Sequence, residues 1–269
     1  MSRRTRIPGW LAGVIGAVAL VGAWWLFSAT IFQPPPGTTF TPVPSPWVVF
    51  STIADDGLAA YRGVFSVTIT EALIGFAWGN GIALLLAATV LLAPRIETVV
   101  TQIAVVSYCL PVVAVGGIAI VVLGGAPRPG EPSATAIFLA ALAVFFTTVV
   151  GALLGFKSAD KASLDVVRVY GGTRFTQLRK VRLIAATPAI LNALQIAVPS
   201  AFLGAVLGEY MGGIDQGVGI TLIRLQGELD SPRVWAVFLL TAAVALIGYG
   251  IVGLLSRVAT PWVAGRSTS

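Results

Sequence analysis

The stretch Ala134–Phe156, ATAIFLAALAVFFTTVVGALLGF, decides the fold class of this chain. It contains 23 residues and no charged side chain. An α-helix needs about 20 predominantly apolar residues to cross a hydrocarbon core that is roughly 30 Å thick. Since a helix in a soluble core is seldom apolar over such a length, the stretch predicts a membrane-spanning helix.

Further apolar stretches of similar length lie on either side of this one. The chain between them is rich in Pro and Gly or in charged residues, which is typical of segments outside a bilayer. A Pro-rich, extended segment at 34–46 and a short interfacial helix at 46–60 follow the first stretch. The pattern predicts an all-α, polytopic membrane protein with six spans, at 10–32, 65–93, 96–123, 134–156, 185–207 and 234–255.

The composition supports a membrane protein and excludes several kinds of active site. The chain of 269 residues is 57% hydrophobic and only 10% charged, whereas soluble domains are about 25% charged. It has no His, which excludes Ser-His-Asp triads and His-ligated zinc or haem, and its one Cys excludes disulfide frameworks. The first span follows three Arg residues, but its apolar run is too long for a signal peptide, and we interpret it as an anchor.

The distribution of Lys and Arg predicts the orientation in the membrane. Six spans place both termini on one side, and cationic residues are retained on the cytoplasmic side. Thirteen of the 17 Lys and Arg residues fall on the side of the termini. The other side holds Arg62, Arg128, Arg224 and Arg233. Both termini are therefore predicted to be cytoplasmic, as is the polar loop 157–182 between the fourth and fifth spans.

The loop 157–182 predicts two short helices separated by a turn. Gly171 and Gly172 allow a backbone turn that residues with a Cβ resist, and Thr173 is a suitable N-cap for the second helix. Apolar residues recur every three positions in that helix, at Phe175, Leu178 and Val181. The pattern alone leaves two interpretations open, a basic loop on anionic lipid headgroups or a docking site for a partner protein.

The same loop resembles the EAA motif of binding-protein-dependent ABC transporter permeases. That motif reads E-A-A, three residues, G, nine residues and I-x-L-P, whereas this chain reads DVVRVYG from Asp165 and then VRLI after the same spacing. Gly171 and Leu183 are identical at key positions, and Pro188 stands at the second Pro common in the family. Asp165 replaces the Glu and Ile184 replaces the first Pro, so the motif is degenerate.

Shorter pieces along the chain are similar to nitrate/sulfonate/taurine-type permeases. They occur in the order found in that family, from about residue 45 to residue 262. They are Pro-Ser-Pro at 44–46, LIGFAWGNG at 73–81, GluTyrMetGly at 209–212 and Gly-Val-Gly at 217–219. This chain departs from the family at Glu71, where these permeases often carry a basic residue, and in the longer, Pro-rich loop 124–132.

The resemblance implies a permease subunit of an ATP-driven importer for a small polar or anionic solute, in the bacterial cytoplasmic (inner) membrane. It implies a single permease domain over 1–269, with the first span and an extracytoplasmic Pro-rich segment at 1–63, a core at 64–262 and a coupling loop at 157–184. The expected partners are two ABC ATPase subunits, a second permease (a second copy or a sibling), an extracytoplasmic solute-binding protein and the lipid bilayer, with no nucleic acid. The chain contains no G-x-x-x-x-G-K-[ST] motif, so we expect a non-enzymatic subunit without cofactors, whose partner ATPase binds ATP and Mg.

The resemblance also implies which residues act. Glycines would form the turn of the coupling loop, arginines would pair with acids of the ATPase, and apolar side chains would fill a groove on it. The coupling residues are Asp165, Arg168, Gly171, Gly172, Thr173, Arg174, Phe175 and Leu178. The candidate substrate path comprises Glu71, Asn80, Tyr108, Pro111 and Glu209. No metal site is predicted.

Each path residue also has a structural interpretation. Glu71 would lie at the outer interface if the second span were displaced by a turn, and Glu209 would pair with Arg224 or Arg233. Polar groups at membrane depth would form interhelical hydrogen bonds, as expected first for Asn80 and Tyr108. Helices are expected to be kinked or interrupted at Pro111, Pro188 and Pro199. A small-xxx-small face for close helix packing is expected at Gly75 and Gly79.

Two other classes of function compete with the permease. An ion-gradient-driven secondary transporter would carry buried acids near the membrane midplane and inverted repeats. No convincing repeat is present and the basic loop would have no role, so this class remains the alternative. An intramembrane enzyme lacks support, since the chain has no His and Gly212-Gly-Ile-Asp215 is not the Gly-x-Gly-Asp motif of aspartyl proteases.

Overall fold

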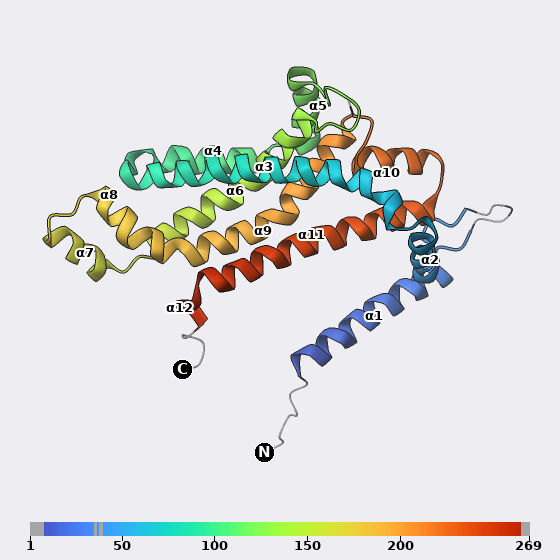
Figure 1. The fold of residues 1–269 in the computed structure, drawn as a ribbon, viewed down its shortest axis with the longest axis horizontal. Coiled ribbons are helices and arrows are strands. Elements are labelled where there is room, and N and C mark those ends of the chain that lie inside the picture. Colours follow the sequence, from blue (N-terminus) through green and yellow to red (C-terminus); the bar gives the residue numbers. More distant parts are fainter. Residues whose placement is uncertain (1–7, 35–36, 38–39, 213, 265–269) are drawn as a thin grey trace, which may run out of the picture. The chain divides into compact units, whose positions relative to one another are not determined.

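The structure is a computed structural model, and it describes residues 8–34, 37, 40–212 and 214–264. Arg3, Arg4, Arg6 and Arg266, which entered the predicted orientation, lie outside these residues. The part of the chain described is helical and contains no strand (Figure 1). The chain divides into two compact units, unit 1 over Met1–Arg62 and Leu222–Leu240, and unit 2 over Gly63–Thr221 and Thr241–Ser269.

Among the described residues, five helices are long and apolar enough to cross a membrane, which confirms the all-α, polytopic class. They are α1 (Gly9–Thr30), α3 (Leu58–Leu92), α6 (Ala134–Lys157), α9 (Leu183–Tyr210) and α11 (Ser231–Ala259). The pair α4 (Glu97–Cys109) and α5 (Val112–Leu123) is a further candidate, bent by 95°. A short 3-10 helix, η1 (Pro94–Ile96), precedes α4, and α12 (Pro261–Ala264) follows α11.

The third predicted span is interrupted at Pro111, as expected for this residue. Leu110 adopts an extended conformation (φ −66°, ψ 129°), because the ring of a following proline disfavours the helical region. The predicted span 96–123 is therefore observed as two helices, which together could form one bent span. Helix α9, by contrast, continues through Pro188 and Pro199, so these two residues do not interrupt it.

Helix α6 packs against α3 on one side and against α9 on another through small residues. A Cβ added to Gly79 of α3 would lie 2.3 Å from the carbonyl oxygen of Ala141. A Cβ added to Gly208 of α9 would lie 2.4 Å from the Cα of Ala136. The packing of Gly75 and Gly79 against α6 confirms the predicted small-xxx-small face, and backbones that approach this closely gain dispersion contacts over their whole length.

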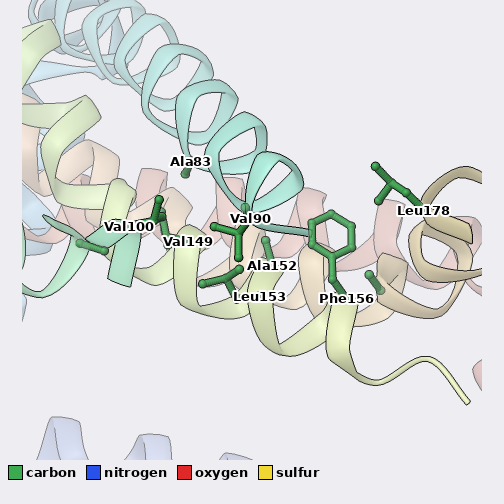
Figure 2. Close-up of a cluster of buried hydrophobic side chains, with 11 residues drawn as sticks. Ala83, Val90, Val100, Val149, Ala152, Leu153, Phe156 and Leu178 are labelled. Atoms are coloured by element: carbon green, nitrogen blue, oxygen red, sulfur yellow. The ribbon is translucent and has the colours of Figure 1, made fainter. Parts of the chain in front are cut away.

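A buried apolar cluster joins α3, α4, α6 and the segment that leads into α9 (Figure 2). Its labelled members are Ala83, Val90, Val100, Val149, Ala152, Leu153, Phe156 and Leu178. Lys157 at the end of α6 forms an ion pair with Glu97 at the start of α4. The cluster and the ion pair fix the end of unit 2 at which the loop 157–182 begins.

Unit 1 holds the Pro-rich segment in place by aromatic and ionic contacts. The rings of Trp24 and Trp235 stack at 5.4 Å, and their indole N–H groups donate to the carbonyls of Pro44 and Pro42 at 3.1 and 3.2 Å. The predicted interfacial helix is shorter than expected, α2 (Pro46–Asp56). It ends at Gly57 (φ 71°) and α3 begins directly afterwards, so the second span starts at residue 58 rather than 65.

The end of α2 carries an ion pair. Arg233 donates two hydrogen bonds to the carboxylate of Asp56, at 2.9 and 3.0 Å. The Arg233 guanidinium, and after it the hydroxyl of Tyr61, hold the pKa of Asp56 below its usual value. Asp230 pairs with the same guanidinium at 2.9 Å, so this arginine joins two acids of unit 1.

Candidate functional site

The loop between α6 and α9 folds as the sequence predicts, into two short helices and a turn. The helices are α7 (Lys161–Val169) and α8 (Arg174–Gln177), and a π-helical segment, η2 (Leu178–Arg182), leads into α9. Gly171 has φ 77°, a conformation that L-residues with a side chain seldom adopt. A Cβ on Gly172 would lie 2.5 Å from Val167 Cγ1, so close approach requires glycine there.

Each short helix begins at a polar side chain that caps its backbone. Thr173 accepts a hydrogen bond from the Thr176 N–H at 3.3 Å, which confirms its predicted role. Asp160, a cap that the sequence analysis missed, accepts from the Ser163 N–H at 3.0 Å. The hydrogen bonds from Ser163 lower the pKa of Asp160, because they stabilise the charged carboxylate.

The base of the loop is attached to unit 2 by hydrogen bonds to carbonyl groups. Arg174 donates to the carbonyl of Leu92 at the end of α3, at 3.4 Å. Arg182 donates to the carbonyl of Phe156 at 3.1 Å. Leu178 is buried in the apolar cluster of Figure 2. The expectation that Leu178 fills a groove on a partner is therefore wrong, because its side chain already packs inside this chain.

Apolar side chains nevertheless gather on the exposed surface of the loop. Tyr170 is 87% exposed and Val169 is 83% exposed. Phe175 on α8 is 60% exposed. The charged side chains of Asp165 and Arg168 are exposed on the same helix, α7. Exposed apolar side chains of this size, on a loop that also exposes charged residues, are suited to association with another molecule.

Two acids of the predicted substrate path lie inside unit 2. Glu71 of α3 and Glu209 of α9 are both fully buried. Glu71 Oε1 accepts a hydrogen bond from the Ser133 N–H at 2.6 Å. Glu209 accepts from the Thr68 hydroxyl at 2.5 Å and from the Gly219 N–H. The structure thus brings together two acids that are far apart in the sequence.

Glu71 lies within α3 (Leu58–Leu92), and its side chain is enclosed by the protein. Whether it lies at the outer interface of the membrane stays a prediction. Within unit 1, Arg224 pairs with Glu228, and Arg233 pairs with Asp56 and Asp230. The sequence analysis missed Thr68 and Ser133, since hydrogen-bond partners so distant in the chain leave no local pattern.

The other three path residues fall into two groups. Asn80 is buried and accepts a hydrogen bond from the Thr148 hydroxyl, which confirms the expected link between helices. Tyr108 is 69% exposed and its ring stacks on Phe146 with centroids 4.6 Å apart. Pro111 is exposed at the break between α4 and α5. Contact of these residues with substrate stays a prediction.

A cavity of about 370 Å³ lies between α3, α9 and α11 within unit 2. All of its lining residues are apolar or Gly, among them Phe76, Phe202 and Ile251. None of the predicted path residues lines it. An apolar cavity leaves a polar solute without hydrogen-bond partners, so we do not assign it to the path. Within the described ranges, no group of three or more Cys, Asp or Glu side chains is arranged to hold a metal ion.

Known proteins that are similar to this chain indicate its family. Residues 79–260 match the family described as binding-protein-dependent transport system inner membrane component. The formylaminopyrimidine transport permease protein ThiX of Halalkalibacterium halodurans is 24% identical over 220 residues, 82% of this chain and 85% of that protein. A Bacillus subtilis protein provisionally named aliphatic sulfonates transport permease protein SsuC is 25% identical over 255 residues, 94% and 88% of the two chains.

Solved structures share the fold. A chain in the crystal structure of a bacterial ABC transporter that imports the acidic polysaccharide alginate superposes with a TM-score of 0.56 and 17% identity. The match covers 92% of this chain and 93% of that one. The family match covers more than half of the chain, and the apolar helices agree with it. The chain therefore belongs to the family of binding-protein-dependent ABC transporter permeases, the inner-membrane components of such systems.

Proposed function

We propose that this chain is the transmembrane permease subunit of an ATP-driven importer, and that a partner ATPase drives it through the loop 157–184. Membership of the permease family supports the transport role. The observation that carries the coupling role is the loop surface, on which Val169, Tyr170 and Phe175 are exposed. Burying such side chains against a partner stabilises a complex by about 25 cal/mol per Å² of apolar area.

The loop is built to transmit a displacement. Its base is attached to the ends of α3 and α6 through Arg174 and Arg182, and Leu178 packs in the core. The attachment at the base, together with the exposed apolar side chains, supports the docking interpretation.

The remaining partners and the orientation belong to the same proposal. We infer that both termini and the loop face the cytoplasm, that two ATPase subunits carry ATP and Mg, and that a second copy or a sibling permease completes the path. A solute-binding protein would deliver a small polar or anionic solute from the other side. A similar solved transporter contains an alginate-bound periplasmic protein, which supports a partner of this kind.

The substrate path is proposed first at the break between α4 and α5. Tyr108 and Pro111 are exposed there, and the ends of interrupted helices leave N–H and C=O groups free to bind polar solutes. Asn80 is hydrogen-bonded to Thr148 inside the packing. We therefore infer that Asn80 supports the path rather than lining it.

Co-purification tests the coupling proposal. The tagged chain is isolated from its native membrane in mild detergent, and the ABC ATPase that accompanies it is identified and titrated back. The double variant Tyr170→Ala, Phe175→Ala should weaken that binding by about 30-fold, the effect of losing one aromatic hot spot, without lowering the melting temperature. Leu246→Ala, which removes a side chain that is 69% exposed on α11, is the matched control.

Two results would contradict the proposal. One is unchanged ATPase binding by the double variant. The other is the absence of any ATPase in several detergents, together with uptake that follows an ion gradient, which would move the secondary transporter to first place.

A further inference from the structure

The buried acids of unit 2 form a pair with an unusual set of hydrogen bonds. Thr68, which lies one helical turn before Glu71 on α3, donates a hydrogen bond to Glu209 at 2.5 Å, so the two buried carboxyl groups are neighbours. Ser133 donates to Glu71 Oε1, while Thr68 and Gly219 donate to Glu209 Oε1 and Oε2. Three of the four carboxyl oxygens therefore have an N–H or O–H donor.

The fourth oxygen, Glu71 Oε2, is buried and has no such donor. A carboxylate is an acceptor only, so two ionised carboxyl groups that face each other cannot form a hydrogen bond. No cation offsets the charge, since the ion pairs found among the described residues involve other acids. Two unpaired charges in such a site would cost several kcal/mol, whereas one proton would satisfy all four oxygens.

We propose that Glu71 carries a proton on Oε2 and donates it to the Glu209 carboxylate, so that the shared proton clamps this end of unit 2. The hydrogen-bond donors assign the proton to Glu71. Glu209 accepts from two separate donors, Thr68 and Gly219, as a carboxylate does. The atom without a donor belongs to Glu71, and an O–H group needs none.

The clamp joins four segments that are separate in the sequence. Glu71 and Thr68 lie on α3, Ser133 caps the start of α6, and Glu209 ends α9. The start of α10 (Val218–Gly227) is bound through Gly219 and through the Val218 N–H, which donates to Thr68 Oγ1 at 3.0 Å.

Glycine is required where α10 meets the pair. A Cβ on Gly217 would lie 2.5 Å from Glu209 Cδ, and a Cβ on Gly219 would lie 2.8 Å from Glu209 Cβ. The backbone thus covers the Glu209 carboxyl group and excludes water from it. The clamp lies at the end of α6 and α9 opposite the loop 157–184, and its argument does not depend on the coupling proposal.

Other titratable groups on these segments are few. Glu131 precedes α6 and pairs with Arg128 at a partly exposed site. Asp215 precedes α10 and is exposed, and Tyr210 follows Glu209. The pair should therefore dominate the pH response of this end. Since the folded state holds a proton that unfolded glutamates release, stability is full at acidic pH and falls as the pH rises, by up to about tenfold in the folding equilibrium per pH unit.

Infrared spectra of the full chain in detergent, compared between the wild type and its variants, test for the proton directly. Wild-type protein at about pH 7 should show the C=O stretch of a protonated carboxyl group, a band that a carboxylate lacks. Glu71→Gln should lose the band, because Glu209 then remains ionised and accepts from the amide. Glu209→Gln should keep the band at a shifted frequency. Absence of the band in wild-type protein would overturn the proposal without any variant.

Thermal unfolding against pH supplies a second, independent readout. The melting temperature of the wild type should fall as the pH rises, and that of Glu71→Gln should change less, because the amide donates without titrating. Thr148→Val, which breaks the buried Asn80 hydrogen bond between α3 and α6, is the control and should shift the whole curve without changing its slope. If the melting temperature of Glu71→Gln fell with pH as steeply as that of the wild type, the result would contradict the shared proton.

Discussion

Helices α6 and α9 pair along their length, and the structures at their two ends are built in opposite ways. At one end Glu71, Glu209 and their donors are buried, and the chain satisfies these polar groups by itself. At the other end Val169 and Tyr170 are apolar and lie in the open. The polar groups of the first end have partners within the chain, whereas the second end leaves apolar side chains exposed, as the proposed association with an ATPase requires.

The two ends should also respond to pH with opposite signs. The proposed shared proton is lost as the pH rises. The cap of α7 depends on an ionised Asp160, whose pKa is lowered by the hydrogen bonds from Ser163, so it is lost as the pH falls. Acid therefore loosens the loop end and alkali loosens the clamp end, which gives a way to separate them experimentally.

The largest effect is expected where α9 meets α6 beside the clamp. Gly208→Val would place a branched side chain 2.4 Å from the backbone of Ala136, and neither helix can yield without separating. We expect a destabilisation of about 3 kcal/mol, seen as a lower melting temperature and loss of monodisperse protein. Gly117→Val on α5, where a Cβ meets open space, should leave both unchanged, and equal behaviour of the two variants would contradict the packing described.

A smaller and more selective effect is expected at the loop end. Gly171→Val forces a β-branched residue to φ 77°, at a local cost of about 1–2 kcal/mol. We expect ATPase binding to fall at least about tenfold, since about 1.4 kcal/mol of distortion corresponds to that factor, while the melting temperature and membrane insertion are kept. Gly171→Asn, which tolerates this conformation, should retain binding. Normal transport by Gly171→Val would argue against a coupling role.

The smallest effect concerns the cap of α7. Amide exchange at Ser163, measured from about pH 6 down to about pH 3, should show that protection persists through the usual titration range of aspartate and is lost below it. The sign follows from the lowered pKa of Asp160, because a carboxylate stabilised in the folded state keeps its charge to lower pH. Asp160→Asn caps the helix without titrating, so its protection should not depend on this ionisation.

The sequence predicts the spans of this protein well because an uncharged apolar run of about 20 residues is long enough to cross a bilayer and is seldom found in a soluble protein. Ala134–Phe156 is observed as α6, which is longer by one residue at its end. Gly171, Thr173 and the pair Gly75 and Gly79 are also predictable, since turns, caps and close packing follow from local residue type and spacing. The 95° angle between α4 and α5 could not be predicted, because Pro111 marks the break in the helix but does not set its angle.

The buried pair was outside the reach of the sequence for a physical reason. Glu71 and Glu209 meet only because α3 and α9 both pack on α6, and no local pattern encodes that meeting. Leu178 was misjudged for the same reason. A recurrence every three positions indicates that a side chain lies on an apolar face of the helix, but whether a partner or the chain's own core covers that face depends on the tertiary fold.

The close contacts that glycines of α3 and α9 make with α6 have a consequence for how these helices move. Where Gly79 meets Ala141 and Gly208 meets Ala136, backbone touches backbone, and no side chain lies between them to change rotamer and absorb a displacement. Helices α3, α6 and α9 should therefore move together as one rigid body. A displacement of α6 where it joins the loop 157–182 would then displace the opposite end of the three helices by a similar distance, and bending would be confined to the segments outside them.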